Sequence, residues 1–85
     1  MQRIATIASP VGLHARPASV FVQAVTASAA EVTLRSGGKS VNAASILGVL
    51  SLGLGAGATV TLESDDEAAL EALVSILETD LDGAA

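Results

Sequence analysis

The sequence predicts an α+β fold, an open-faced β-sandwich in which a four-stranded antiparallel sheet carries three helices on one face, in the order β-α-β-β-α-β-α. Each expected strand has one apolar and one polar face, as in an antiparallel sheet with one solvated side. Apolar residues elsewhere recur at helical spacing, and glycine or serine marks the junctions. The length of 85 residues fits one domain, expected over residues 1–85.

The first strand and first helix are expected before residue 28. Residues 3–8 predict a strand with Ala5 and Ile7 on one face. Apolar residues then recur at helical spacing from residue 15 to about residue 27. Pro17 suits the first turn of this helix, where a missing N–H costs nothing.

A hairpin is expected next, over residues 31–36 and 39–43. Both segments alternate apolar and polar residues, which predicts two strands. Gly37-Gly38 lies between them and is typical of a two-residue turn.

The second half predicts a short helix, a strand and a terminal helix. Ser45 can cap a helix over residues 46–51, and residues 59–63 predict the fourth strand. Ser64 and Glu67 have the spacing of a capping box, with Ser64 as the N-cap. The apolar stripe of the terminal helix is expected at Leu70, Leu73, Val74, Leu77 and Leu81.

Composition excludes several classes of function. The absence of cysteine excludes disulfides and Cys-based zinc sites, and it favours a reducing compartment, for which we expect the cytoplasm. Nucleic-acid binding is not expected, because the chain has four bases without a cluster and one aromatic residue. Residues 63–85 hold eight acids and no base, which predicts the solvated face and first turn of the terminal helix.

An uncharged stretch over residues 40–62 is long enough to span a bilayer. Its four glycines would weaken a helix, its end alternates like a strand, and neither flank carries an aromatic residue or a cluster of basic residues. We therefore expect no stable membrane insertion.

The candidate site is the lone histidine, His14, at the start of the first helix. The first N–H groups of a helix, here those of Ala15 and Arg16, bind anions, and phosphate above all. The same positive end favours a neutral, nucleophilic imidazole, and the Arg16 guanidinium can bind phosphoryl oxygens. The simpler alternatives are an N-cap or a surface histidine. A phosphoryl acceptor and donor fits better than a hydrolase with His14 as base, because no carboxylate lies near it in sequence. No metal or cofactor is expected.

Two motifs resemble the histidine-containing phosphocarrier family, HPr, of the bacterial sugar phosphotransferase system. They are Gly12-Leu13-His14-Ala15-Arg16-Pro17-Ala18 and Gly38-Lys39-Ser40-Val41-Asn42, the second leading into residues 45–53. The resemblance implies the open-faced sandwich and a relay. Enzyme I would phosphorylate Nδ1 of His14, Arg16 would steady the phosphate, and IIA domains of sugar permeases would receive it.

The resemblance also implies a regulatory serine and a docking helix. Ser45 would be phosphorylated by an ATP-dependent kinase, and a phosphorylase would remove the phosphate. Ile46, Leu47 and Leu50 would contact partners, and Val49 and Leu52 would face the core. A monomer is expected.

Two departures and three rivals remain beside this interpretation. Val11 stands where family members often carry a polar residue, and Ala44 where many carry Lys before the serine, which makes recognition by a kinase less certain. The rivals are a paralogue in a nitrogen-type phosphotransferase chain, a glycerone-kinase relay, and a co-repressor module that acts through phosphorylated Ser45. Retention of His14 and Arg16 argues against the last as the sole role.

Overall fold

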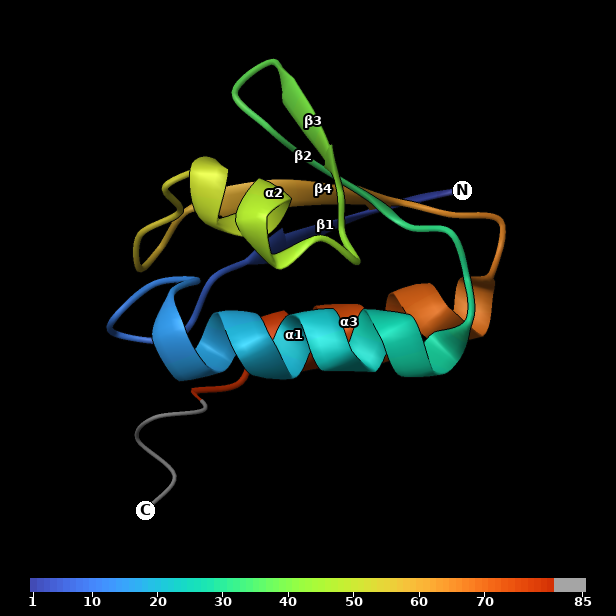
Figure 1. Ribbon diagram of the computed structural model, residues 1–85, viewed down its shortest axis with the longest axis horizontal. Coiled ribbons are helices and arrows are strands. Elements are labelled where there is room, and N and C mark those ends of the chain that lie inside the picture. Colours follow the sequence, from blue (N-terminus) through green and yellow to red (C-terminus); the bar gives the residue numbers. More distant parts are fainter. Residues whose placement is uncertain (81–85) are drawn as a thin grey trace.

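The protein forms a four-stranded antiparallel sheet with three helices on one face, and the computed structural model describes residues 1–80 (Figure 1). This architecture confirms the predicted fold class. The elements are β1 (Gln2–Thr6), α1 (Ala15–Ser28), β2 (Thr33–Ser36), β3 (Lys39–Asn42), α2 (Ile46–Ser51), β4 (Thr59–Glu63) and α3 (Glu67–Leu77).

The strand order is β1-β4-β2-β3, so the last strand lies between the first two. Ala5 pairs with Val60, and Leu34 pairs with both Leu62 and Val41. These residues point to the covered face, because side chains alternate along a strand. The predicted alternation in all four strands is therefore confirmed.

Helices α1 and α3 lie side by side beneath the sheet, and α2 packs against α1 and β3 (Figure 1). Phe21, the chain's one aromatic residue, is fully buried between these layers. Around it the core is aliphatic, with the large side chains Ile7, Leu13, Leu34, Val49, Leu62, Leu70 and Leu73. One small core thus holds α1, and with it the start of α1, against the sheet.

The predicted two-residue hairpin is confirmed. Ser36 pairs with Lys39, and Gly37 and Gly38 have φ of 56° and 82°. A type I′ turn requires positive φ at both central residues, which glycine adopts without steric cost.

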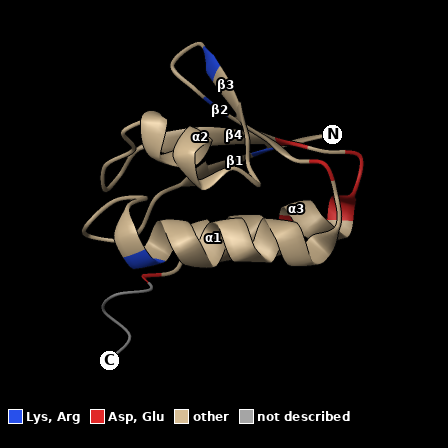
Figure 2. Ribbon diagram, viewed as in Figure 1, with Lys and Arg blue, Asp and Glu red and all other residues tan. Residues whose placement is uncertain are grey.

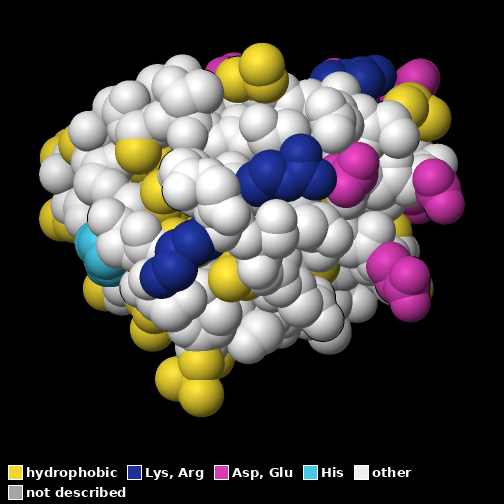
Figure 3. Space-filling model, turned by 90° about the horizontal axis from the view of Figure 1, so that it is seen from above, with side chains coloured by type: hydrophobic (Ala, Val, Ile, Leu, Met, Phe, Trp, Pro, Cys, Tyr) yellow, Lys and Arg dark blue, Asp and Glu magenta, His cyan; other side chains and the backbone are white. Residues whose placement is uncertain are grey.

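The uncovered face of the sheet carries a polar ladder across all four strands. Gln2 donates to Glu63 at 3.2 Å, Arg35 donates to Glu63 at 3.0 Å, and the Arg35 Nε donates to Ser40 at 3.4 Å. The space-filling view from above shows adjacent basic and acidic side chains on this face (Figure 3). This face of the sheet is therefore mainly polar and can remain in contact with solvent.

The N-terminus of α3 differs from the prediction. The N-cap is Asp66, whose Oδ1 accepts from the Ala69 N–H at 3.0 Å, and not Ser64. Ser64 is buried, and its Oγ accepts from the Asp66 N–H at 3.2 Å, so it shapes the turn before the helix. The expected stripe lies on the inner face through Leu77, whereas Leu81 lies outside the described residues.

Three strands are shorter than predicted. The first spans Gln2–Thr6, the second begins at Thr33 and the third ends at Asn42. Beyond these strand ends, the Ala8 N–H donates to the Leu77 carbonyl at 3.0 Å, and the Ala43 N–H donates to the Val32 carbonyl at 2.9 Å. Helix α1 extends one residue further, to Ser28. Within residues 1–80, no helix is both long and apolar enough to cross a membrane.

Candidate phosphoryl-transfer site

His14 is the N-cap of α1 and lies half-buried at its mouth. Its backbone is extended, with φ −133° and ψ 169°, and its side chain makes no capping hydrogen bond. An N-cap side chain ordinarily accepts from the second or third helical N–H. His14 holds the position of a cap without acting as one, so its ring is available to another group.

Two backbone donors directly after His14 in the chain have no acceptor within the described residues. Among residues 1–80, neither the Ala15 N–H nor the Arg16 N–H makes a hydrogen bond, and Pro17 has no N–H. The first bond of the helix, from the Ala18 N–H to the His14 carbonyl, is long at 3.4 Å. The start of α1 therefore presents a pair of free donors, as an anion-binding helix end does.

Ala15 has a left-handed backbone, with φ 48°. This region costs an L-residue with a Cβ roughly 1–2 kcal/mol. The surrounding structure must hold Ala15 there.

The Arg16 side chain is exposed and makes no salt bridge or hydrogen bond with another residue of the described chain. The other two arginines are engaged: Arg35 with Glu63, and Arg3 with Glu71 and Glu67. The Glu71 hydrogen bond is the main reason why the pKa of Arg3 lies above its ordinary value. Arg16 is therefore the arginine left to bind an external anion.

The loop that carries His14 is anchored from behind. The Gly12 N–H donates to the Ser9 carbonyl at 2.9 Å, which closes a turn over Pro10 and Val11. The Leu13 N–H donates to the Leu54 carbonyl at 2.9 Å, and the Leu13 and Leu54 side chains are buried. Val11 is 52% exposed and gives no polar contact beside His14.

Helix α2 contributes an exposed apolar surface. Ser45 is the N-cap of this helix. Ser45 Oγ accepts from the Gly48 N–H at 3.1 Å, so the predicted cap is confirmed. Val49 is buried and Leu52 half-buried, as expected. The residues expected to contact partners are exposed: Ile46 by 40%, Leu47 by 78% and Leu50 by 38%.

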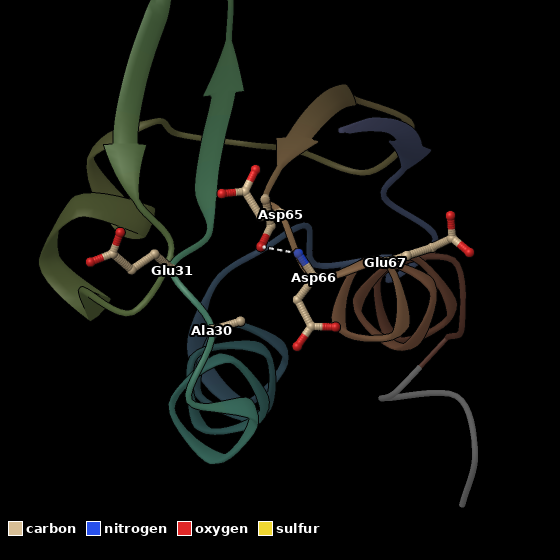
Figure 4. A pocket seen from close by; sticks show the side chains of 6 residues that line it. Ala30, Glu31, Asp65, Asp66 and Glu67 are labelled. Atoms are coloured by element: carbon tan, nitrogen blue, oxygen red, sulfur yellow. Dashed lines mark hydrogen bonds between the residues drawn. The ribbon is translucent and has the colours of Figure 1, made fainter.

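An acidic hollow of about 520 Å³ lies where the segment before β2 faces the start of α3 (Figure 4). The acids at the α3 start gather at the opposite end of the molecule from the start of α1 (Figure 2). Their carboxylates diverge, because Glu31 and Glu67 point away from Asp65 and Asp66. The described residues contain no group of three or more acids or histidines that could hold a metal ion. This hollow is therefore a solvated surface.

Comparison with known proteins gives consistent matches over the described chain. Residues 1–79 match the family described as the PTS HPr component phosphorylation site. The HPr-like protein Crh of Halalkalibacterium halodurans is 44% identical over 70 residues, which cover 79% of this chain and 83% of that protein.

Two solved structures share the fold. The phosphocarrier protein HPr of Bacillus anthracis superposes with a TM-score of 0.82 at 42% identity, covering 91% of this chain and 95% of that one. Crh of Bacillus subtilis, named for catabolite repression and described as a swapped dimer, gives 0.71 at 42% identity, covering 81% and 83%.

These matches and the open-faced sandwich define a protein of the phosphocarrier type, from a family whose members work with proteins of the phosphotransferase system. The chain belongs to the HPr family, over at least residues 1–79.

Sequence reasoning missed two features of the site: the left-handed backbone of Ala15 and the backbone contact behind Gly12. Neither has a signal in propensity, because alanine rarely adopts positive φ. The glycine-rich segment 53–57 has the sequence pattern of a turn, which does not indicate that Leu54 within it bonds to the residue before His14.

Proposed function

We propose that the chain is a phosphocarrier of the phosphoenolpyruvate-dependent relay, which accepts a phosphoryl group from enzyme I and passes it to the IIA domain of a sugar permease. The observation that carries this proposal is the start of α1, where His14 makes no capping hydrogen bond and is followed directly by two N–H groups and an arginine side chain that have no partner among residues 1–80. An acceptor of phosphate needs this combination of nucleophile and anion binding.

In the first transfer the Nδ1 lone pair of His14 attacks phosphorus while the bond between phosphorus and enzyme I breaks. In the second, a nucleophile of the IIA domain attacks the same phosphorus, the bond between phosphorus and Nδ1 breaks, and its electron pair returns to the His14 ring. The Ala15 and Arg16 N–H groups and the Arg16 guanidinium hold the phosphoryl oxygens. The in-line geometry exists only within each complex, because this chain supplies one side of the reaction.

Partners would dock on the apolar surface of α2 at Ile46, Leu47 and Leu50. Exposed apolar residues beside a site are typical of interaction surfaces. The proposed carrier acts as a monomer. We place it in the cytoplasm, a reducing compartment, which the absence of cysteine supports. Because the related Crh is described as a swapped dimer, light scattering at micromolar concentration is the test of the monomer.

Incubation with phosphoenolpyruvate and enzyme I tests the relay. The wild-type chain should gain one acid-labile phosphate, and His14→Ala should gain none, because the chain has no other histidine. The melting temperature should change little, since the ring makes no hydrogen bond within the described residues. An acid-labile phosphate on the Ala variant would assign the acceptor elsewhere.

A second candidate function is regulation through Ser45, favoured by its position as the cap beside the exposed Ile46 and Leu47. Ser45→Asp should keep or raise the melting temperature, because aspartate caps as well as serine and suits the helix dipole. Its charge lies in the docking surface, so phosphorylation of His14 by enzyme I should slow strongly.

Ser45→Ala is the matched control and should accept phosphate at nearly the wild-type rate. A wild-type rate in Ser45→Asp would leave Ser45 as a cap only.

A further inference from the structure

Gly12 lies in direct contact with the backbone of the segment that follows α2. A Cβ at this position would overlap the Leu54 carbonyl oxygen and lie 2.8 Å from Gly55 Cα and 3.1 Å from Gly55 C. Backbone atoms cannot swing aside as the end of a side chain can. With its φ of 76°, residue 12 must therefore be glycine for both steric and conformational reasons.

We infer that this contact between Gly12 and residues 54–55, which we term the glycine clamp, positions His14 relative to the α2 surface. The inference rests on the proposed function, because it assigns the clamp a role in the transfer step. Gly12 is thus a positioning residue that acts through Leu13, whose N–H bonds to the Leu54 carbonyl at 2.9 Å.

The clamp joins the two functional regions over a short length of chain. On one side, His14 follows Gly12 by two residues. On the other, Leu54 follows the C-cap of α2, Leu52, by two residues, and Gly53 ends the helix by donating to the Leu50 carbonyl at 3.2 Å. The acceptor ring and the docking helix are therefore held together through backbone rather than through flexible side chains.

The far end of the glycine-rich segment is tied to the sheet. The Gly57 N–H donates to the Ile7 carbonyl at 2.8 Å, and the Ile7 N–H donates to the Ala58 carbonyl at 2.8 Å. The Ala58 N–H donates to the Gly55 carbonyl at 3.1 Å. The surface that Gly12 meets is thus fixed on both sides, so a side chain at residue 12 would displace the His14 loop rather than the segment.

Gly12→Ala tests the clamp, and Gly57→Ala is its matched control. Gly57 has almost the same φ, 80°, but a Cβ there would meet nothing within 4 Å. Both variants impose the cost of a left-handed alanine, and only Gly12→Ala adds the overlap. Any difference between them beyond stability therefore belongs to the contact.

The first measurement is single-turnover transfer from phosphorylated enzyme I over a range of enzyme I concentrations. Gly12→Ala should lower the maximal rate by up to about 100-fold, the order expected for an ångström-scale misplacement of a reacting group. The half-saturating concentration should change little, because the α2 surface is intact. Gly57→Ala should transfer at the wild-type maximal rate despite a lower melting temperature.

The second measurement is hydrogen exchange of the Leu13 amide in the unphosphorylated protein. Gly12→Ala should lose its protection, because the Leu13 to Leu54 bond must lengthen, and Gly57→Ala should keep it. If Gly12→Ala does not fold, Leu54→Ala loosens the same anchor without a Cβ at residue 12. It should also lower the maximal rate more than it raises the half-saturating concentration.

The outcomes separate the two proposals. A wild-type chain that accepts no phosphate overturns the proposed function and this inference with it. If the wild-type chain accepts phosphate, a wild-type maximal rate in folded Gly12→Ala, or in Leu54→Ala where Gly12→Ala does not fold, overturns the inference alone. An equal loss of maximal rate in Gly57→Ala would also overturn the inference, because backbone strain alone, without steric overlap, would then explain the slower transfer.

Discussion

Helices α1 and α3 lie side by side under one sheet, but they begin in opposite ways. The start of α3 is closed, because Asp66 accepts from the Ala69 N–H at 3.0 Å. The start of α1 is open, because His14 makes no capping bond, and it includes a left-handed alanine, Ala15, with φ 48°. One start contributes stability, and the other leaves donors free and carries conformational strain.

At the start of α1 the chain lacks the stabilising cap that α3 has, and its backbone donors stay available to a ligand. An open helix start keeps the attraction of its N–H groups and dipole for an external anion. A capped start satisfies the same groups internally. The acids around α3 strengthen the contrast, because the first turn of α3 contains Glu67 and disfavours a further anion, whereas the first turn of α1 contains no acid.

The largest expected effect comes from Arg16, the charged group at the open start. Arg16→Glu should lower the rate of transfer from enzyme I by about 100-fold or more, the order seen when a donor to a developing charge is lost. Arg16→Lys should lose less, because it keeps the charge and loses only the planar fork. Rapid-quench measurement of phosphate on His14 gives both rates, and equal rates would remove the electrostatic role.

A smaller effect, on stability alone, should separate the two helix starts directly. Asp66→Ala should lower the free energy of unfolding by about 1 kcal/mol, because it removes a cap. His14→Ala should change it by less than about 0.5 kcal/mol, since such changes are typical of surface positions without a special contact. Urea unfolding followed by circular dichroism measures both, and an equal loss would show that His14 does contribute as a cap.

A stability effect of similar or smaller size than that of Asp66→Ala is expected at the two left-handed alanines at the ends of α1. Ala29 has φ 59° at the C-terminal end, where helices commonly place glycine. Ala29→Gly should raise the free energy of unfolding by up to about 1 kcal/mol and leave transfer unchanged.

Ala15→Gly should stabilise by a similar or smaller amount, but it also loosens the backbone beside His14. Its transfer rate is therefore the informative measurement. A slower Ala15→Gly with an unchanged Ala29→Gly would show that the rigid alanine serves the site, and an unchanged rate would show that its conformation is incidental.

Much of the fold could be predicted from local pattern. The order of elements, the hairpin at Gly37-Gly38 and the cap at Ser45 follow from alternation, helical spacing and turn chemistry, and the structure confirms them. The site could be proposed from His14 and Arg16 because both residues lie at a helix start that the sequence pattern predicts. Their roles in transfer stay predictions.

Errors arose where neighbouring residues compete or where a contact is long-range. Both Ser64 and Asp66 can cap a helix, and burial of Ser64 decides in favour of Asp66. Strand ends depend on partners far along the chain, which alternation does not record. The same is true of the Gly12 contact, since a glycine in a loop does not indicate what packs against it.

The strand order β1-β4-β2-β3 affects how the chain folds during its synthesis on the ribosome. Gln2 contacts Glu63, which lies 61 residues later in the chain, so β1 stays unpaired until β4 has been synthesised. The hydrogen bond from the Leu13 N–H to the Leu54 carbonyl likewise cannot form until Leu54 has been synthesised. Non-local pairings of this kind form slowly and leave early segments exposed. The loop that carries His14 is synthesised before the segment that anchors it, so it can reach its folded conformation only after Leu54 has been made.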